Sequence, residues 1–435
     1  MVRIGWREGL ALIVGLAAAV PAQAGEIDKF KSDDAALSLG EVDFPGGHTL
    51  ELTAGIGSGL FHSADDPTTV LWTISDRGPN IDCAEAEKIT GVTTEKLCQG
   101  DDKGKVFPLP AFTPTIYRVE LGEDGMFKVA GVLPLLGADG KPITGISNPL
   151  TLTKTEQAFD STGQSLPLDP GGLDTESLVR LSDGTFWVAE EYGPSLVHVA
   201  ADGKVLERLV PAGLEADLAK APYPVNGALP AILMKRALNR GLESVAVSVD
   251  EKRLYLLMQS PLANPDQDAY KAARMARLLE IDLADRKTVG QYVYILDAPE
   301  TFRKDNSTKQ NDVRLSELTV SPSGELVALE RIGKTTKLHR LDLAGATNIT
   351  GGAWDDPATA PSLEQLTEAD LGAKGIVPLG KKLLLDSADL EGLPAKIEGV
   401  SFVDADTIVL INDNDFGIDG STTEILRMKL PAATN

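Results

Sequence analysis

Short apolar runs separated by polar turns recur along the chain, and four stretches follow the same order. Each has an apolar run with a glutamate at or near its start, then a polar turn, then a second apolar run. The four stretches begin near Gly172, Gly241, Arg314 and Lys396, and their turns read SDG, VDEK, PSG and VDAD. Runs of this length between turn residues are typical of β-strands, so each stretch predicts a pair of neighbouring strands.

Further strands are predicted beside these pairs. A third run with alternating polarity follows, as in TIYRVEL from Thr115 and KLHRLDL from Lys337, and fourth runs are FKVAGVLPL, VLERLVP and VGQYVYIL. A fifth unit, from Gly59 to Asn80, keeps the order without the glutamate. Such repeats predict an all-β fold, a single β-propeller of four-stranded blades. An all-β sandwich does not repeat one strand–turn–strand unit so many times.

The number of blades stays open at this point. Five units are evident, and residues 137–170 and 344–395 are either long insertions or a degenerate sixth blade. The last unit has three strands, so we expect the N-terminal run HTLELTAGI, from His48, to supply its fourth strand and close the ring. Closure would remove two exposed sheet edges. A helix is predicted over residues 265–276.

The first 24 residues are typical of a secretory signal peptide. Arg3 and Arg7 precede the apolar run GLALIVGLAAAV, and the sequence AQA at 22–24 has small residues where signal peptidase recognises them. We predict cleavage after Ala24, a propeller domain over 25–435, and export to the periplasm or the medium. The apolar run is short for the roughly 30 Å core of a bilayer, which disfavours a membrane anchor. No segment after residue 24 has an apolar run long enough to predict a membrane span.

The two cysteines, Cys83 and Cys98, lie in one polar stretch. An exported chain meets an oxidising compartment, where an even number of cysteines is typical of disulfides. We therefore predict a Cys83–Cys98 disulfide. The alternative, two free thiols, fits export less well, and the spacing is not that of a C-x-x-C redox motif.

The net charge of the chain limits the classes of partner that it is expected to bind. The chain has 64 acidic and 41 basic side chains, and its formal net charge is −23. Such a charge argues against nucleic acid and anionic membranes as partners. The four histidines show no metal-ligand spacing, which argues against a histidine-rich zinc site. The expected partner is a small molecule, and the sequence indicates no oligomeric state.

The recurrent glutamates are Glu176, Glu243, Glu317 and Glu398. The innermost strand of each propeller blade lines the central channel, so these carboxylates are expected to converge near its axis. Like charges at short range raise one another's pKa unless a cation compensates them. A divalent cation fits such a site, and Ca²⁺ fits best because it accepts six to eight oxygen ligands. The alternative is that each glutamate accepts hydrogen bonds from the backbone of a neighbouring blade.

A second group of charged residues follows the second strands. We predict catalytic roles for Asp76, Arg77, Glu190, Glu191 and Arg331, substrate binding by Tyr192, Arg240, Arg314 and Lys396, and further metal ligands in Asp413 and Asp415. Carboxylates interleaved with cations can hold a metal ion and an anionic substrate together. The alternative is a solvated charged rim. The acidic stretch from Asp413 lacks the glycine of an EF-hand loop.

Several enzyme classes are excluded by their missing motifs. The chain contains no G-x-S-x-G elbow, no H-E-x-x-H metal motif and no complete Walker A loop. Metal-assisted hydrolysis best matches a site with many acids and few histidines.

The chain resembles the bacterial "esterase-like activity of phytase" family of phytase-like domain proteins. The residues that carry the resemblance are SDRGPN from Ser75, DTES from Asp174, EEYGP from Glu190, NRGLE from Asn239, Glu317, and INDNDF from Ile411. The resemblance implies a secreted propeller assigned to phosphoester or ester hydrolysis. The acidic metal motifs of the well-characterised β-propeller phytases are not found.

The sequence thus predicts an exported metal-dependent hydrolase of phosphoesters or related esters. Two alternatives stay open: a propeller that binds a ligand or partner without catalysis, and a lactonase-type propeller with an axial Ca²⁺. The lactonase type would share the metal but not the substrate.

Overall fold

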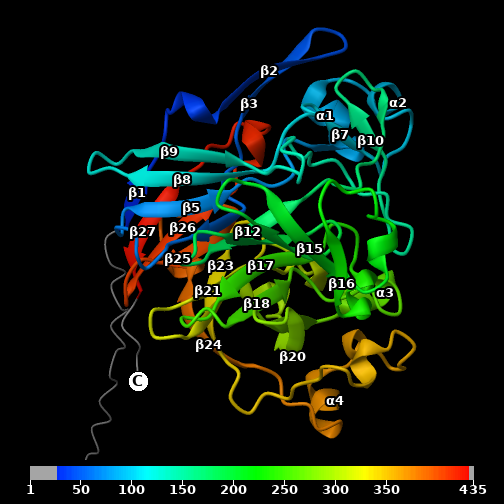
Figure 1. Ribbon diagram of the computed structural model, residues 1–435, viewed down its shortest axis with the longest axis vertical. Coiled ribbons are helices and arrows are strands. Elements are labelled where there is room, and N and C mark those ends of the chain that lie inside the picture. Colours follow the sequence, from blue (N-terminus) through cyan, green and yellow to red (C-terminus); the bar gives the residue numbers. More distant parts are fainter. Residues whose placement is uncertain (1–26, 431–435) are drawn as a thin grey trace, which may run out of the picture.

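The computed structural model describes residues 27–430 and consists mainly of β-sheets with short helices (Figure 1). The predicted signal peptide and its cleavage site lie outside these residues. No helix in the described part is long and apolar enough to cross a membrane.

The predicted strand pairs and most of their neighbours are confirmed. One four-stranded sheet contains, in spatial order, β4 (Gly59–Phe61), β5 (Val70–Ile74), β8 (Thr115–Leu121) and β9 (Phe127–Pro134). The next contains β12 (Thr175–Arg180), β13 (Phe186–Glu190), β14 (Ser195–Val199), β15 (Val205–Pro211) and β16 (Val225–Leu229).

Three more sheets follow the same order along the chain. One contains β17 (Leu242–Val247), β18 (Arg253–Met258), β19 (Met275–Asp282) and β20 (Lys287–Ile295). Another contains β21 (Arg314–Val320), β22 (Leu326–Arg331), β23 (Thr336–Asp342) and β24 (Gly380–Asp386). In the last, β25 (Ile397–Phe402), β26 (Thr407–Asn412) and β27 (Ile425–Lys429) are joined by β1 (Asp28–Phe30).

The first strands of these sheets surround a common axis. They contact one another in the cyclic order β4, β12, β17, β21, β25 and back to β4. A narrow cavity of about 40 Å³ is lined by residues from all of them. A separate apolar core fills the space between each pair of neighbouring sheets. Each sheet therefore packs apolar side chains against its neighbours on both of its faces.

The predicted closing strand is wrong. The run from His48 forms β3 (His48–Thr53), which pairs with β2 (Ser38–Phe44) in a hairpin that projects from the sheets (Figure 1). Gly46 and Gly47 have positive φ angles in the turn between them, which glycine adopts without strain. The chain therefore folds back locally. The strand that pairs with β27 is β1, which lies earlier in the chain.

Neither long segment forms a further sheet around the axis, and the second one supplies the fourth strand of the sheet that begins with β21. Within 137–170, β10 (Ala158–Asp160) and β11 (Ser165–Leu166) join β6 (Ile81–Asp82) and β7 (Lys105–Phe107) in a small separate sheet. Within 344–395 lie α4 (Glu368–Ala373) and β24. Neither segment adds a strand to the cycle around the axis. The helix predicted over 265–276 is shorter, α3 (Gln267–Ala272), because Met275 begins β19.

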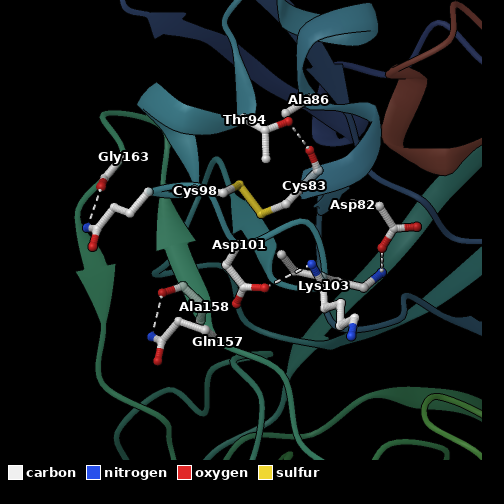
Figure 2. Close-up of a disulfide and its surroundings, with 12 residues drawn as sticks. Asp82, Cys83, Ala86, Thr94, Cys98, Asp101, Lys103, Gln157, Ala158 and Gly163 are labelled. Atoms are coloured by element: carbon white, nitrogen blue, oxygen red, sulfur yellow. Dashed lines mark hydrogen bonds and ion pairs between the residues drawn. A yellow bond between two sulfur atoms is a disulfide. The ribbon is translucent and has the colours of Figure 1, made fainter.

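The predicted disulfide is confirmed. Cys83 and Cys98 are bonded and fully buried, and their Cα atoms are 6.0 Å apart (Figure 2). The bond connects the two ends of a helical segment that contains α1 (Ala86–Thr90) and α2 (Thr94–Leu97). Thr94 Oγ1 donates a hydrogen bond to the Cys83 carbonyl oxygen at 2.8 Å. The disulfide thus restrains the segment between β6 and β7.

Reducing this disulfide should lower the free energy of unfolding by no more than about 3 kcal/mol, the chain-entropy effect of a loop of this length. The cysteines are 15 positions apart. Because the bond lies outside the sheets around the axis, these should stay folded after reduction. Urea unfolding with and without reductant measures the effect. Two reactive thiols in unfolded, unreduced protein would contradict the prediction.

Candidate functional site

Three of the recurrent glutamates occupy β-bulges. The pairing of β12 with β13 skips Glu176, that of β17 with β18 skips Glu243, and that of β25 with β26 skips Glu398. A bulge leaves one residue unpaired and re-aims its side chain. One carboxylate oxygen from each of these glutamates lies within 4.8 Å of the others. The predicted convergence therefore holds for these residues.

A glycine allows the close approach of two sheets at this point. A Cβ atom at Gly241 would lie 2.0 Å from the backbone oxygen of Glu191. Only glycine fits so close to a neighbouring backbone. The approach carries Glu243, two residues further on, to the end of β13.

Glu317 does not join the cluster, contrary to the prediction. In β21 the residue skipped by the pairing is Ser316, so Glu317 lies one position further along the strand. Its carboxylate accepts hydrogen bonds from Ser177 Oγ at 2.6 Å and from the backbone N–H groups of Leu60 and Leu318 at 3.0 Å. This is the backbone-bonding alternative. The signal was present in the sequence, because aligning Leu315 with Leu242 places Ser316, not Glu317, opposite Glu243.

Neighbouring residues at the strand ends face different environments. Glu190, at the end of β13, is fully buried and accepts hydrogen bonds from Arg208 Nη2 and Ser195 Oγ, both at 2.7 Å. Backbone N–H groups, including that of Gly193, also donate to it. Its acceptors are satisfied by the fold, so the predicted catalytic role of Glu190 is not supported. Glu191 points the other way, because successive strand residues alternate between faces.

Glu330 repeats this arrangement at the end of β22. It is fully buried and accepts hydrogen bonds from Tyr294 Oη and Lys381 Nζ, both at 2.7 Å. Its oxygen also lies near those of Asp297 and near His339 Nε2. The Nζ atoms of Lys337 and Lys381 already contact the two Asp297 oxygens at 2.7 Å. Ammonium groups therefore occupy the positions that a metal ion would need.

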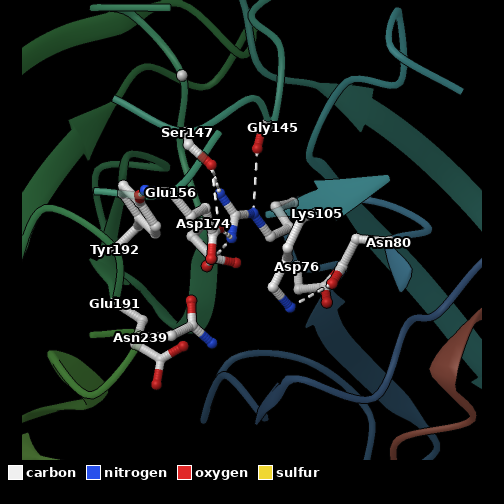
Figure 3. Close-up of polar contacts among 12 residues, drawn as sticks. Asp76, Asn80, Lys105, Gly145, Ser147, Glu156, Asp174, Glu191, Tyr192 and Asn239 are labelled. Carbon is white, nitrogen blue, oxygen red and sulfur yellow. Dashed lines mark hydrogen bonds and ion pairs between the residues drawn. The ribbon is translucent and has the colours of Figure 1, made fainter. Parts of the chain in front are cut away.

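Arg77 and Tyr192 are also committed to the fold. Arg77 donates hydrogen bonds to the Gly145 oxygen at 3.2 Å, to Glu156 Oε1 at 3.0 Å and to Ser147 Oγ at 2.8 Å (Figure 3). Its guanidinium lies 4.6 Å from the centre of the buried Tyr192 ring. The predicted roles of Arg77 in holding a substrate oxyanion and of Tyr192 in binding substrate are therefore not supported. Glu156 and Ser147 were missed because no strand pattern marks their segment.

Asp174 was not predicted as a ligand, yet it completes a second group of acids. One oxygen from each of Asp76, Asp174 and Glu176 lies within 4.8 Å of the others. Asp174 is 2% exposed, and its Oδ2 atom receives no hydrogen bond. Arg77 Nη1 lies 3.5 Å from that atom. Glu191 is similar: it is 2% exposed, its Oε1 atom receives no hydrogen bond, and Arg240 Nη1 lies 3.8 Å away.

Burial and mutual repulsion raise the pKa values of these acids. The pKa of Glu176 lies well above its ordinary value because of burial and of Glu243, and that of Asp76 because of burial and of Asp174. Burial also raises the pKa of Glu191 well above its ordinary value. Burial and Glu398 raise the pKa of Glu243 to about 7. Arg240, Arg314 and Arg331 offset these upward pKa shifts only in part, and a bound cation would offset them further.

The cationic side chains near these acids differ in their hydrogen-bond and ion-pair partners. Arg331 donates hydrogen bonds to Ser316 Oγ, to the Ile332 oxygen and to Glu398, so it positions that carboxylate. Lys396 is ion-paired with Asp415. Asp413, whose pKa burial and Glu398 raise to about 7, is half-buried beside them.

Arg314 is the exception among these cations. Its guanidinium has no single ion-pair partner among the residues that the structure describes, but Glu398 and Glu243 lie close enough to act on its pKa in the upward direction. Arg240, together with burial, lowers its pKa to about 10, since the two positive charges repel. Arg240 itself donates to the Asn239 oxygen at 2.6 Å and keeps its Nε atom without a partner. These two guanidinium groups can therefore accept an anion.

Acids and arginines share one cleft of about 1180 Å³. Asp76, Asp174 and Glu176 line it together with Arg240 and Arg314. Asp82 of β6, Lys105 of β7 and Lys88 of the disulfide-restrained segment between them also line it, as do Asp415 and Asp419 from the stretch after β26. The predicted site residues that line it are Asp76, Arg77, Glu176, Arg240, Arg314, Lys396 and Asp415. The others do not line it: Glu190, Glu191, Tyr192, Glu243, Glu317, Arg331, Glu398 and Asp413. The cleft can hold a small anionic molecule against the acid cluster.

The chain is similar in sequence or in fold to several known proteins. An uncharacterized secreted protein of Arthroderma benhamiae is 27% identical over 232 residues, which cover 47% of this chain and 45% of that protein. The chain thus matches about half the length of that relative. Among solved structures, a luciferin-regenerating enzyme is 11% identical, with a TM-score of 0.36. The aligned part covers 94% of this chain and 98% of the chain of that enzyme. The WD40 repeats of RRP9 are 12% identical, with coverages of 94% and 99% and a TM-score of 0.36.

A family model described as phytase-like, esterase-like activity of phytase, matches residues 54–416. The matched range contains every strand of the sheets around the axis except β1 and β27, and every residue of the cleft up to Phe416. The resemblance noted from SDRGPN, DTES and EEYGP is therefore confirmed over most of the chain, and the protein belongs to the phytase-like family.

Proposed function

We propose that the protein is an exported metal-dependent hydrolase of phosphoesters or related esters, built as a five-bladed propeller that β1 closes. The observation that carries the proposal is the opposition of two incomplete charge groups in one cleft. Asp174 Oδ2 is buried and receives no hydrogen bond, although Arg77 Nη1 lies 3.5 Å away, and the Arg314 guanidinium lines the same cleft, where Arg240 repels it. A cation and an anionic substrate together would satisfy both.

The residues present fit a divalent cation. The two groups of acids near the axis are together called the axial cluster. It offers carboxylate oxygens from Asp76, Asp174, Glu176, Glu243 and Glu398. Ca²⁺ accepts six to eight oxygen ligands in irregular geometry, so it suits such a set best. When bound, the cation supplies a water of lowered pKa and neutralises charge that develops in the transition state.

The chain's own residues would divide the remaining work. Arg314 and Arg240 orient the anionic group of the substrate by charge-assisted hydrogen bonds. Glu191, whose Oε1 atom receives no hydrogen bond and lies 3.8 Å from Arg240 Nη1, would take a proton from the attacking water when it is ionised. Arg331 holds Glu398 in position and does not contact the substrate. Lys396, at the edge of the cleft, adds positive charge once Asp415 is displaced.

Export rests on two observations. The N-terminal sequence is typical of a signal peptide, and the fungal relative is described as secreted. We infer that the mature protein begins after Ala24 and works in the periplasm or the medium, where its disulfide is stable.

Steady-state assays test the proposal. Purified protein should hydrolyse a phosphomonoester or phosphodiester in the presence of Ca²⁺ and lose that activity after chelation. Arg314→Gln should lower kcat/KM by roughly 10- to 100-fold, the effect of losing a hydrogen bond to a charged group. Arg340→Gln is the control, because Arg340 lies outside the cleft and pairs with Glu325.

Other outcomes would replace the proposal. Activity that survives thorough chelation would exclude the metal mechanism. Turnover of lactones but not of phosphoesters would favour the lactonase-type alternative. Ca²⁺ binding without turnover of any ester would leave a propeller that binds a ligand without catalysis.

A further inference from the structure

Asn239 differs from the other residues with an unusual backbone conformation. Several residues other than glycine have a positive φ angle, which is uncommon for a residue with a side chain. In all the others within the described part of the chain, the fold uses the side chain in a hydrogen bond, an ion pair or an aromatic contact. They are Gln99, Glu251, Arg286, Lys396, Asp415 and Phe416. At Asn239, where φ is 54°, the side-chain Oδ1 atom is buried and receives no hydrogen bond.

Asn239 lies where a ligand can reach it. It is half-buried and lines the cleft together with Arg240, and it belongs to the group of side chains drawn in Figure 3 with Asp174 and Glu191. A left-handed backbone is costly for a residue other than glycine, and such conformations cluster at functional sites. We propose that Asn239 determines substrate specificity by accepting, at Oδ1, a hydrogen bond from a hydroxyl group of the substrate.

The backbone of Asn239 also holds the neighbouring guanidinium. Arg240 Nη1 donates a hydrogen bond to the Asn239 carbonyl oxygen at 2.6 Å, and Arg240 Nε has no partner. Arg240 Nη1 lies 3.8 Å from Glu191 Oε1, which is longer than a hydrogen bond. Arg240 therefore keeps a donor for an anion, while Asn239, next to it in the chain, keeps an acceptor.

These two residues require different groups in one ligand. The oxygens of an ionised phosphate accept hydrogen bonds, so they match Arg240 but do not satisfy Asn239 Oδ1. A hydroxyl group can donate to that oxygen. Because consecutive Cα atoms are only about 3.8 Å apart, the hydroxyl and the phosphate can belong to one small molecule. The substrate class is therefore a phosphoester whose alcohol part has a free hydroxyl group.

The inference rests on the proposed function, because it concerns the specificity of the same cleft. A site with a buried acceptor for a substrate hydroxyl rejects the analogue without that hydroxyl, since the acceptor then stays unpaired. We expect a hydroxylated phosphoester to be hydrolysed with a kcat/KM at least about tenfold above that of its analogue without hydroxyl groups, the effect of one hydrogen bond.

Glycerol 1-phosphate and propyl phosphate test the inference, because they differ only in hydroxyl groups. In the presence of Ca²⁺ the wild type should prefer glycerol 1-phosphate. Asn239→Gly should abolish the preference without lowering Tm, since glycine adopts a positive φ without strain. Asn239→Asp keeps an acceptor oxygen and should keep the preference, although its charge weakens the binding of both esters. Glu251→Gly is the matched control: it changes a left-handed residue that pairs with Ser182, outside the cleft, and should keep the preference.

The outcomes separate this inference from the proposed function. Equal kcat/KM values for the two esters, or a preference that survives in Asn239→Gly, would overturn the inference and leave the hydrolase. If neither ester is turned over, the hydrolase is overturned, and calorimetric titration with the same two esters decides the inference. Tighter binding of glycerol 1-phosphate that Asn239→Gly abolishes would support it, whereas equal binding or no binding would overturn it.

Discussion

Glu190→Ala should lower the free energy of unfolding by roughly 3–5 kcal/mol, the usual effect of removing one partner of a buried ion pair. Arg208 and Glu190 have fully buried side chains, and their charged atoms are 2.7 Å apart. Without the carboxylate, the Arg208 charge would stay buried, and several backbone N–H groups would lose their acceptor. Urea unfolding followed by circular dichroism measures the loss. If Glu190→Ala fails to fold, Glu190→Gln should fold with a smaller loss.

The adjacent residue provides a matched control. Glu191 is as buried as Glu190 but receives no hydrogen bond at Oε1 and is repelled by Glu243. Glu191→Ala should therefore leave the stability of the cation-free protein unchanged or raise it, while lowering turnover. A Glu190→Ala variant with wild-type stability and no turnover would reverse this assignment and make Glu190 catalytic.

Ca²⁺ should raise the free energy of unfolding, because the axial cluster exists only in the folded chain. At a concentration a hundredfold above Kd, mass action gives about 2.7 kcal/mol for one site. Chelation should reverse the rise. Differential scanning calorimetry over a series of Ca²⁺ concentrations measures the effect as a concentration-dependent Tm.

Two glutamate variants distinguish a metal site from a structural one. Glu243→Gln keeps the side-chain shape and removes one charged ligand, so the rise in Tm with Ca²⁺ should shrink. Glu317→Gln changes a carboxylate that backbone and serine donors satisfy. It should lower the basal stability by about 1 kcal/mol, the worth of a hydrogen bond, and leave the rise intact. A wild-type Tm that Ca²⁺ does not move would contradict the axial site.

Much of the architecture could be predicted because it depends on local patterns. The strand pairs around Glu176, Glu243 and Glu398, and their alternating neighbours, follow from apolar periodicity and turn residues. The disulfide follows from the cysteine count and the export signal. Closure was harder, since β1 and the run from His48 both offer strands, and only the local turn at Gly46 and Gly47 removes the second from the sheets.

Individual site residues depended on features finer than the repeat. A one-residue displacement of the bulge in β21 places Ser316 where the other strands have a glutamate, and Glu317 is thereby satisfied by its own neighbours. At the end of β13, alternation sends Glu190 into the interior and Glu191 toward the axis. Residue type alone does not distinguish these positions, because the same carboxylate can serve either.

The sequence by itself determined the repeated strands, the disulfide, the acidic character of the axis and the family. Only the tertiary structure decided which charges remain available. Arg77 donates hydrogen bonds to Glu156 and Ser147, which lie in a segment without strand pattern, whereas Arg314 lines the cleft beside Arg240, which repels it. The physical reason is that a charged side chain already hydrogen-bonded or ion-paired to a residue distant in the sequence is not available to bind a ligand. What is left over at the cleft, and hence what can bind there, depends on how the distant segments pack.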